Sequence, residues 1–128
     1  MSRIVYDAGA LIAIDRRHSQ TAVERHRKFL AQRHEILVPV AAAAQAVRNP
    51  AAQVRLMRAL QGCAIVPFSS RDLLPVGRLL ARSGSADVVG AVVAVTAAQA
   101  GAAVVTSDPN DIGALLAVLG VTVAVLPA

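Results

Sequence analysis

A chain of 128 residues, 55% of them hydrophobic, is long enough to bury a core, and we expect a single domain spanning residues 1–128. With two Phe, one Tyr and no Trp, that core is predicted to be aliphatic. The formal net charge is +5 and twelve of the thirteen basic residues are Arg. Guanidinium groups match phosphate geometry, so this charge permits an RNA partner, although a GC-rich genome gives the same composition.

The sequence also predicts where the protein works. Cys63 is alone, so we expect no disulfide and a reducing compartment. The first residues do not combine a basic segment with an apolar one, so we expect no signal peptide. The longest weakly charged window, 88–107, is interrupted by Gly90, Gln99 and Gly101, and is not expected to span a membrane. We therefore expect a cytoplasmic protein.

Short apolar runs alternate with longer helical patterns along the whole chain. In order, the patterns predict a strand at 3–6, helices at 8–15 and 21–33, a strand at 36–38, helices at 40–48 and 51–60, a strand at 64–67, helices at 71–82 and 86–100, a strand at 102–105, a helix at 111–119 and a strand at 121–125. Fully apolar strands are typical of a sheet covered on both faces. The alternation therefore predicts an α/β fold with a central parallel sheet.

Acidic residues follow two of these strands directly. Asp7 follows the first strand, and Asp108 and Asp111 follow the fourth. In parallel sheets, ligands bind beyond the carboxyl ends of the strands, so we expect these acids to lie close together there. Asp87, at the start of the helix 86–100, is expected to join them. Helix capping is the alternative for Asp87, Asp108 and Asp111, whereas a buried Asp7 needs a partner or a bound ion.

Carboxylates gathered at one edge repel one another, and a divalent cation relieves that repulsion. Ligand sets made only of oxygen suit Mg²⁺ or Mn²⁺ rather than zinc. In an Arg-rich protein, a metal held by aspartates indicates hydrolysis of phosphodiesters. An acidic-pocket enzyme of another α/β family would be expected to carry a second acid two residues after Asp7, where this chain has Gly9.

Three segments carry a family resemblance: IVYDAGALIAI (4–14), VPVAAAAQAVR (38–48) and ADVVGAVVAVTAAQAGAAVVTSDPNDI (86–112). Together they resemble the PIN-domain ribonucleases, and most closely the VapC-type toxins of bacterial toxin–antitoxin pairs. The resemblance extends over the whole chain. It implies a three-layer α/β/α sandwich, Mg²⁺- or Mn²⁺-dependent RNA cleavage, an antitoxin partner and a homodimer. Carried over, Asp7 and Asp108 match metal-site acids, and Asp111 matches a frequent additional one.

Two positions depart from the family pattern. Gln45 stands where the family usually has a Glu, and Gly90 stands where it has an Asp. Gln45 keeps an oxygen but loses the charge, and it could bind a metal-bound water. Gly90 supplies no ligand. Asp87 lies one turn earlier on the same helical face and could take its place. The departures predict a weak catalyst.

We therefore predict a metal-dependent endoribonuclease, the toxin of a type II toxin–antitoxin pair, with Asp7, Asp87 and Asp108 as catalytic residues. Asp111 would complete the metal site. The alternative is a PIN-like domain that binds RNA or an antitoxin without cutting, which Gln45 and Gly90 favour. For phosphate contacts we name the basic residues nearest in sequence to the expected groove, Arg16, Arg17 and Arg48. His18, His26 and His34 lie on or beside a charged helix, and we expect no metal role for them.

Overall fold

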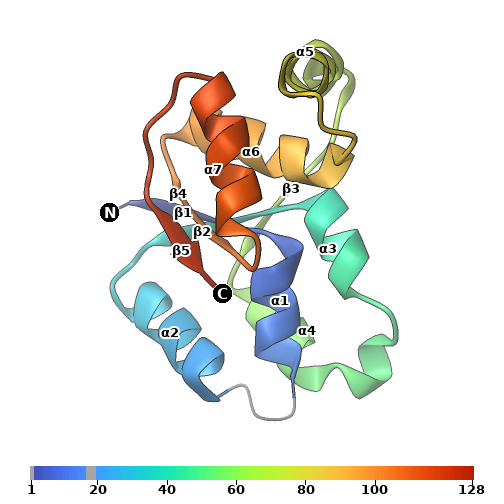
Figure 1. Ribbon diagram of the computed structural model, residues 1–128. Coiled ribbons are helices and arrows are strands. Elements are labelled where there is room, and N and C mark those ends of the chain that lie inside the picture. Colours follow the sequence, from blue (N-terminus) through green and yellow to red (C-terminus); the bar gives the residue numbers. More distant parts are fainter. Residues whose placement is uncertain (1, 17–19) are drawn as a thin grey trace.

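The computed structural model describes residues 2–16 and 20–128. Within them the chain alternates helices and strands much as the sequence predicts (Figure 1). The elements are β1 (Arg3–Tyr6), α1 (Ala8–Asp15), α2 (Gln20–Ala31), β2 (Glu35–Pro39), α3 (Val40–Ala46), the 3₁₀ turn η1 (Pro50–Ala52), α4 (Val54–Gln61), β3 (Ala64–Val66), the 3₁₀ turn η2 (Ser70–Asp72), α5 (Leu73–Ser83), α6 (Val88–Ala100), β4 (Ala103–Thr106), α7 (Pro109–Val118) and β5 (Val125–Pro127).

The five strands form one parallel sheet in the order β3-β2-β1-β4-β5. β1 lies at its centre, pairing with β2 on one side (Ile4 with Ile36) and with β4 on the other (Tyr6 with Val105). Because all pairs are parallel, the carboxyl ends of all five strands lie at one edge. The expected central parallel sheet is confirmed.

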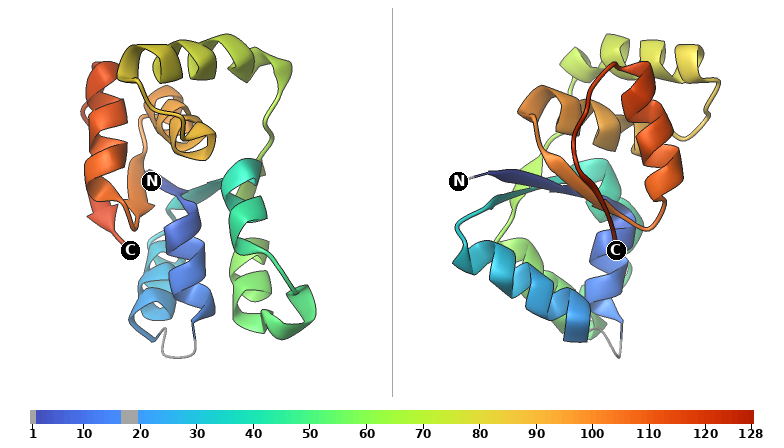
Figure 2. Two further views of the ribbon diagram at one scale, coloured as in Figure 1. Left: turned by 45° about the vertical axis from the view of Figure 1, so that its right-hand side comes forward. Right: turned by 60° about the vertical axis from the view of Figure 1, so that its left-hand side comes forward.

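Helices cover both faces of the sheet, which makes three layers (Figure 2). Alternate residues of β1 point to opposite faces, as the period of a strand requires. Val5 packs in one apolar cluster with α5, α6 and α7, and Ile4 and Tyr6 pack in a second with α1, α3 and α4. The core is aliphatic apart from Tyr6.

Two element boundaries differ from the sequence prediction for identifiable reasons. The last strand runs from Val125 to Pro127 rather than over 121–125, because its partner β4 sets the register, with Val104 opposite Val125. The helix expected at 51–60 is divided into η1 and α4. Between them, the buried Gln53 accepts hydrogen bonds from the backbone N–H groups of Arg48 and Asn49.

No single helix in the described ranges is both long and apolar enough to cross a membrane. The bent pair Ser70–Ser83 and Val88–Ala100 meets the length and composition criteria only when its two helices are taken together.

Candidate active site

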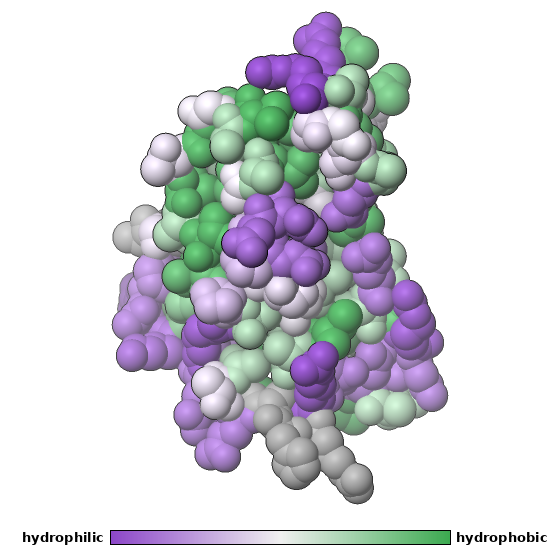
Figure 3. Space-filling view, viewed as in Figure 1, coloured by the Kyte–Doolittle hydropathy of each residue, from purple (hydrophilic) through white to green (hydrophobic). Residues whose placement is uncertain are grey.

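The direction in which the chain adds strands to the sheet reverses between β1 and β4. From β1 the strand order proceeds to β2 and β3 on one side, and to β4 and β5 on the other. In open parallel sheets, the crevice that binds ligands lies at such a point, beyond the carboxyl ends of the strands. Asp7 directly follows β1, and Asp108 follows β4 after one intervening residue. Figure 3, which has the same view as Figure 1, shows a cluster of hydrophilic side chains over the place where α1 and α7 begin.

Asp7 is held firmly at this edge. It is the N-cap of α1, and its Oδ1 accepts a hydrogen bond from the Ala8 N–H at 2.7 Å. Its Oδ2 accepts one from the Thr106 hydroxyl at 2.8 Å. Only 9% of Asp7 is exposed, and burial raises the pKa of its carboxyl. The two hydrogen bonds oppose that rise, and the carboxylates of Asp87 and Asp108 add to it.

Asp87 and Asp108 each lie close enough to Asp7 for their carboxylates to raise its pKa. Each of the three stands at the N-cap position of a helix: Asp7 on α1, Asp87 on α6 and Asp108 on α7. The positive end of a helix stabilises a nearby anion, so three helix dipoles partly offset the repulsion among these acids.

Thr106 joins the two strand ends. It is fully buried at the end of β4. Its hydroxyl donates to Asp7 and accepts from the backbone N–H of Asp108 at 3.0 Å. One side chain therefore fixes the Asp7 carboxylate and the start of the loop that carries Asp108.

Asp87 caps α6, as the capping alternative proposed. Its Oδ1 accepts from the Gly90 N–H at 2.9 Å, and its own N–H donates to the Ser85 hydroxyl. A Cβ added to Gly90 would overlap Oδ2 of Asp87. The Asp87 carboxylate therefore occupies the space that a side chain at position 90 would need.

Two of the predicted acids of this edge are open to solvent. Asp111 is exposed in the first turn of α7, without a hydrogen bond to its side chain in the described part of the chain. Asp108 is also exposed, and its carboxylate makes no capping bond.

The donor chemistry of this edge fits Mg²⁺ or Mn²⁺, because every acid in it offers oxygen. Each Asp7 oxygen accepts one hydrogen bond and keeps a free lone pair. Within residues 2–16 and 20–128, however, no three His, Cys, Asp or Glu side chains are already close enough to hold an ion together. Mg²⁺ usually keeps several waters and uses one or two carboxylates, which suits such a site.

Comparison with known proteins identifies the fold. One chain of the crystal structure of VapBC2 from Rickettsia felis, bound to a DNA fragment from their promoter, superposes with a TM-score of 0.71. The superposition covers 98% of this chain and 98% of that chain at 14% sequence identity. The fold of this chain is PIN-like. No protein-family model and no curated protein matches the sequence.

Within this PIN-like fold, Gln45 is exposed near the end of α3. α3 packs against both α1 and α6, the helices that begin at Asp7 and Asp87.

The predicted phosphate-binding arginines are placed less favourably. Arg16 follows the last residue of α1, at the opposite end from Asp7. Arg48 donates through Nη1 to the carbonyls of Ala44 and Val47, and Arg17 lies outside the described residues.

Sequence reasoning missed three residues. Thr106 has no predicted role, although a hydroxyl buried at the end of a strand needs a partner. Gly9 was considered only as a missing acid. A Cβ there would lie 2.8 Å from the backbone nitrogen of Ser107, so α1 approaches the β4–α7 connection too closely for any side chain. His26 was placed on a charged helix, but it is buried.

Proposed function

We propose that this PIN-like domain is a metal-dependent endoribonuclease of the VapC toxin type, with Asp7, Asp87 and Asp108 as its catalytic residues. The observation that supports it best is the position of Asp7 and Asp108 just beyond the carboxyl ends of the neighbouring strands β1 and β4, on a fold shared with VapBC2. Mg²⁺ or Mn²⁺ bound there would activate water and stabilise the leaving oxygen.

The chain's own residues would act mainly by positioning. Thr106 and the Ala8 N–H hold both oxygens of Asp7, so its carboxylate loses little freedom when a cation binds. Asp87 fills the space at Gly90 and would replace the acid that the family carries at that position. Asp111 would support the ion from further out, and Gln45 would bind water.

Partners follow from the same resemblance. VapBC2 is named as a complex, which supports an antitoxin partner for this chain. RNA is the proposed substrate, since the net charge is +5. Arg16, Arg17 and Arg48 remain the proposed phosphate contacts, although the bonds of Arg48 to carbonyls of α3 already engage one of its nitrogens.

A second function is favoured by a specific observation. No three potential ligands are close enough to hold a metal ion in the described residues, and Gln45 and Gly90 carry no charge. A domain that binds RNA or an antitoxin without cutting would have this arrangement.

Metal-titrated cleavage of single-stranded RNA separates the two functions. We expect slow cleavage, faster with Mn²⁺ than with Mg²⁺ because Mn²⁺ stands higher than Mg²⁺ in affinity for such ligands. Asp7→Asn should abolish it, while Glu24→Gln, which removes an exposed acid on α2, should leave it unchanged. Cleavage that survives Asp7→Asn would contradict the proposed site, and RNA binding with no cleavage at any metal concentration would establish the second function.

A further inference from the structure

Gly9, the second residue of α1, lies directly against Ser107 in the connection from β4 to α7. A Cβ added at Gly9 would overlap the Ser107 Oγ and would lie 2.5 Å from its Cβ and 2.8 Å from its backbone nitrogen. A Cβ added at Gly77 or Gly113, which also lie inside helices, would meet nothing within 4 Å. Gly9 has no positive φ, so the close approach, and not the backbone conformation, requires a glycine here.

This contact joins the two segments that carry Asp7 and Asp108. Asp7 is the N-cap of α1, two residues before Gly9, and Asp108 directly follows Ser107. The Thr106 hydroxyl links the same segments, since it donates to Asp7 and accepts from the Asp108 N–H. The packing of Gly9 against Ser107 is therefore a second point at which α1 and the β4–α7 connection are fixed to each other.

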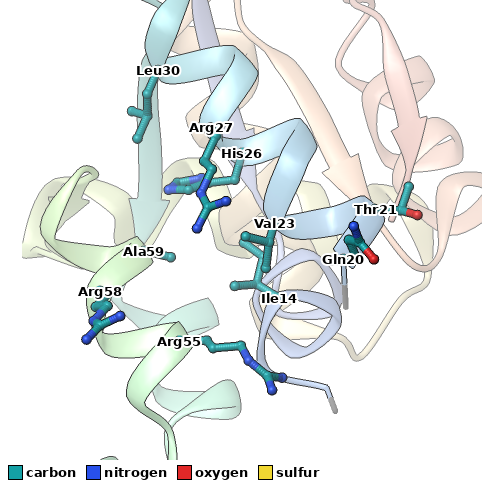
Figure 4. Close-up of a pocket in the computed structure, with 10 residues that line it drawn as sticks. All are labelled: Ile14, Gln20, Thr21, Val23, His26, Arg27, Leu30, Arg55, Arg58 and Ala59. Carbon is teal, nitrogen blue, oxygen red and sulfur yellow. The ribbon is translucent and has the colours of Figure 1, made fainter. Parts of the chain in front are cut away.

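α1 is the more rigid side of this contact. Leu11 is fully buried and Ile14 is 3% exposed. Ile14 packs with Val23 of α2 at the wall of a pocket between α1, α2 and α4 (Figure 4). The β4–α7 connection is less constrained, since Ser107 and Asp108 are both exposed. A larger side chain at position 9 would therefore displace the connection and not the helix.

The displacement that such a side chain requires is comparable with what a ligand site tolerates. To admit a Cβ at position 9, the Ser107 nitrogen would have to recede from 2.8 Å to about 3.4 Å, where ordinary van der Waals contact begins. Rotation of the Ser107 hydroxyl would not relieve this contact, because the nitrogen belongs to the main chain. Side chains that bind a ligand must be held within roughly 0.5 Å of their working geometry. A main-chain shift beside Asp108 reaches that limit.

We propose that Gly9 and Ser107 are positioning residues of the proposed metal site. Their contact sets how far the Asp108 carboxylate lies from Asp7, and thereby the affinity of this edge for a divalent cation. This inference rests on the proposed function. It adds that the affinity depends on a packing contact as well as on the acids themselves.

Titration with Mn²⁺, followed by the paramagnetic signal of the free ion, tests the proposal together with chemical denaturation. Gly9→Ala should weaken Mn²⁺ binding about tenfold, as changes to groups that orient metal ligands do. The control Gly113→Ala adds a methyl group to α7 where nothing lies within 4 Å, and it should leave the affinity unchanged. A lower free energy of unfolding with unchanged Mn²⁺ affinity in Gly9→Ala would show a purely structural role and would overturn the proposal.

Removing the Ser107 side chain should compensate in part. Ser107→Gly takes the Cβ and Oγ out of the contact but leaves the backbone nitrogen. Gly9→Ala should therefore weaken Mn²⁺ binding only about threefold in the Ser107→Gly background, a coupling expected of residues in contact. This comparison remains available if Gly9→Ala alone does not fold. An equal affinity of Ser107→Gly and the double variant, or the same loss from Gly9→Ala in both backgrounds, would overturn the proposal.

Hydrogen exchange of the Asp108 amide, measured without metal, separates this inference from the proposed function. The Asp108 N–H donates to Thr106 Oγ1, and displacement of the connection would lengthen that bond. The amide should therefore exchange faster in Gly9→Ala and not in Gly113→Ala. Unchanged exchange in Gly9→Ala, with Mn²⁺ still bound by the unaltered chain, would overturn the positioning role and leave the proposed function standing. An unaltered chain that binds no Mn²⁺ would overturn both.

Discussion

At the residue scale, Asp87 and Gly90 form a coupled pair. The Asp87 carboxylate caps α6 through the Gly90 N–H, and it occupies the space next to the Gly90 Cα. Glycine inside a helix costs about 1 kcal/mol relative to alanine, so a structural reason is needed for its presence. The Asp87 carboxylate supplies one.

A double-mutant cycle tests this coupling. Asp87→Ala should lower the free energy of unfolding by about 1 kcal/mol, the usual value of an N-cap. Gly90→Ala should bring no gain while Asp87 is present, because the new methyl group displaces the capping carboxylate. In the Asp87→Ala background it should stabilise by up to about 1 kcal/mol. Chemical denaturation of the four proteins gives the coupling.

The matched control is Gly77 of α5, where an added Cβ would meet nothing within 4 Å. Gly77→Ala should stabilise by about 1 kcal/mol whether or not Asp87 is present. A gain from Gly90→Ala in the unaltered chain as large as that from Gly77→Ala would contradict the coupling.

The sequence predicts that Asp7 and Asp108 lie at one edge of the sheet, because an apolar run shows where each strand ends. The structure places both residues at that edge, beyond the ends of β1 and β4. The roles of Thr106 and Gly9 were not predictable, because Thr106 contacts Asp7 and Gly9 contacts Ser107, and each pair is about a hundred residues apart in the sequence. A sequence pattern has no signal for a contact at that separation.

At the element scale, α2 is tied to the sheet by a buried polar contact. The helix is amphipathic, yet His26 lies on its inner face and meets Tyr6 of β1. Burial lowers the pKa of His26 from its ordinary value of 6.5, although the Ala59 carbonyl partly opposes this. The folded state therefore holds His26 neutral at a pH at which the unfolded chain binds a proton.

Stability should consequently depend on pH through His26. Its contribution is fully present above about pH 6.5, and it falls by up to about 1.4 kcal/mol per pH unit as the pH drops below that value. Unfolding experiments from pH 7 to pH 5 should show this loss, and His26→Gln should reduce the slope. His34→Gln is the control, since His34 is bonded near the surface to Ser2.

The neighbouring groups do not change charge in this range. Burial raises the pKa of Tyr6 and raises that of Cys63 to about 11, so both stay neutral. The guanidinium groups of Arg27, Arg55 and Arg58 stay charged. An unchanged slope in His26→Gln would therefore show that His26 does not titrate in the folded state as inferred.

Element bounds were predictable to within a few residues where the pattern is strong. The strand at 3–6 and the helix at 8–15 match fully. The last strand was misplaced because residues 121–126 are mostly apolar, and only pairing with β4 selects which of them form the strand.

At the scale of the whole molecule, hydrophobic surface gathers over the end of the protein that carries α5, α6 and α7 (Figure 3). Leu73 and Leu74 at the start of α5 are 69% and 59% exposed. By contrast, most small residues of α3 are buried within the chain, among them Ala42, Ala43 and Ala46. We therefore propose that the homodimer implied by the family resemblance forms through α5, where apolar side chains are exposed.

Light scattering on the purified chain tests this assembly. We expect a dimer at micromolar concentration and a monomer after Leu73→Lys with Leu74→Lys, because two charges on a desolvated face oppose association. Val54→Lys, at a 53% exposed position of α4, should leave the dimer intact. A monomeric unaltered chain would contradict the proposal.

The whole account depends on the acids at the β1–β4 edge binding a divalent cation. Titration with Mn²⁺, followed by the paramagnetic signal of the free ion, measures this directly and needs no substrate. The account predicts that the unaltered chain binds Mn²⁺ and that Asp7→Asn weakens binding at least about tenfold, while Glu24→Gln does not. Equal Mn²⁺ binding by the unaltered chain and the Asp7→Asn variant would contradict it.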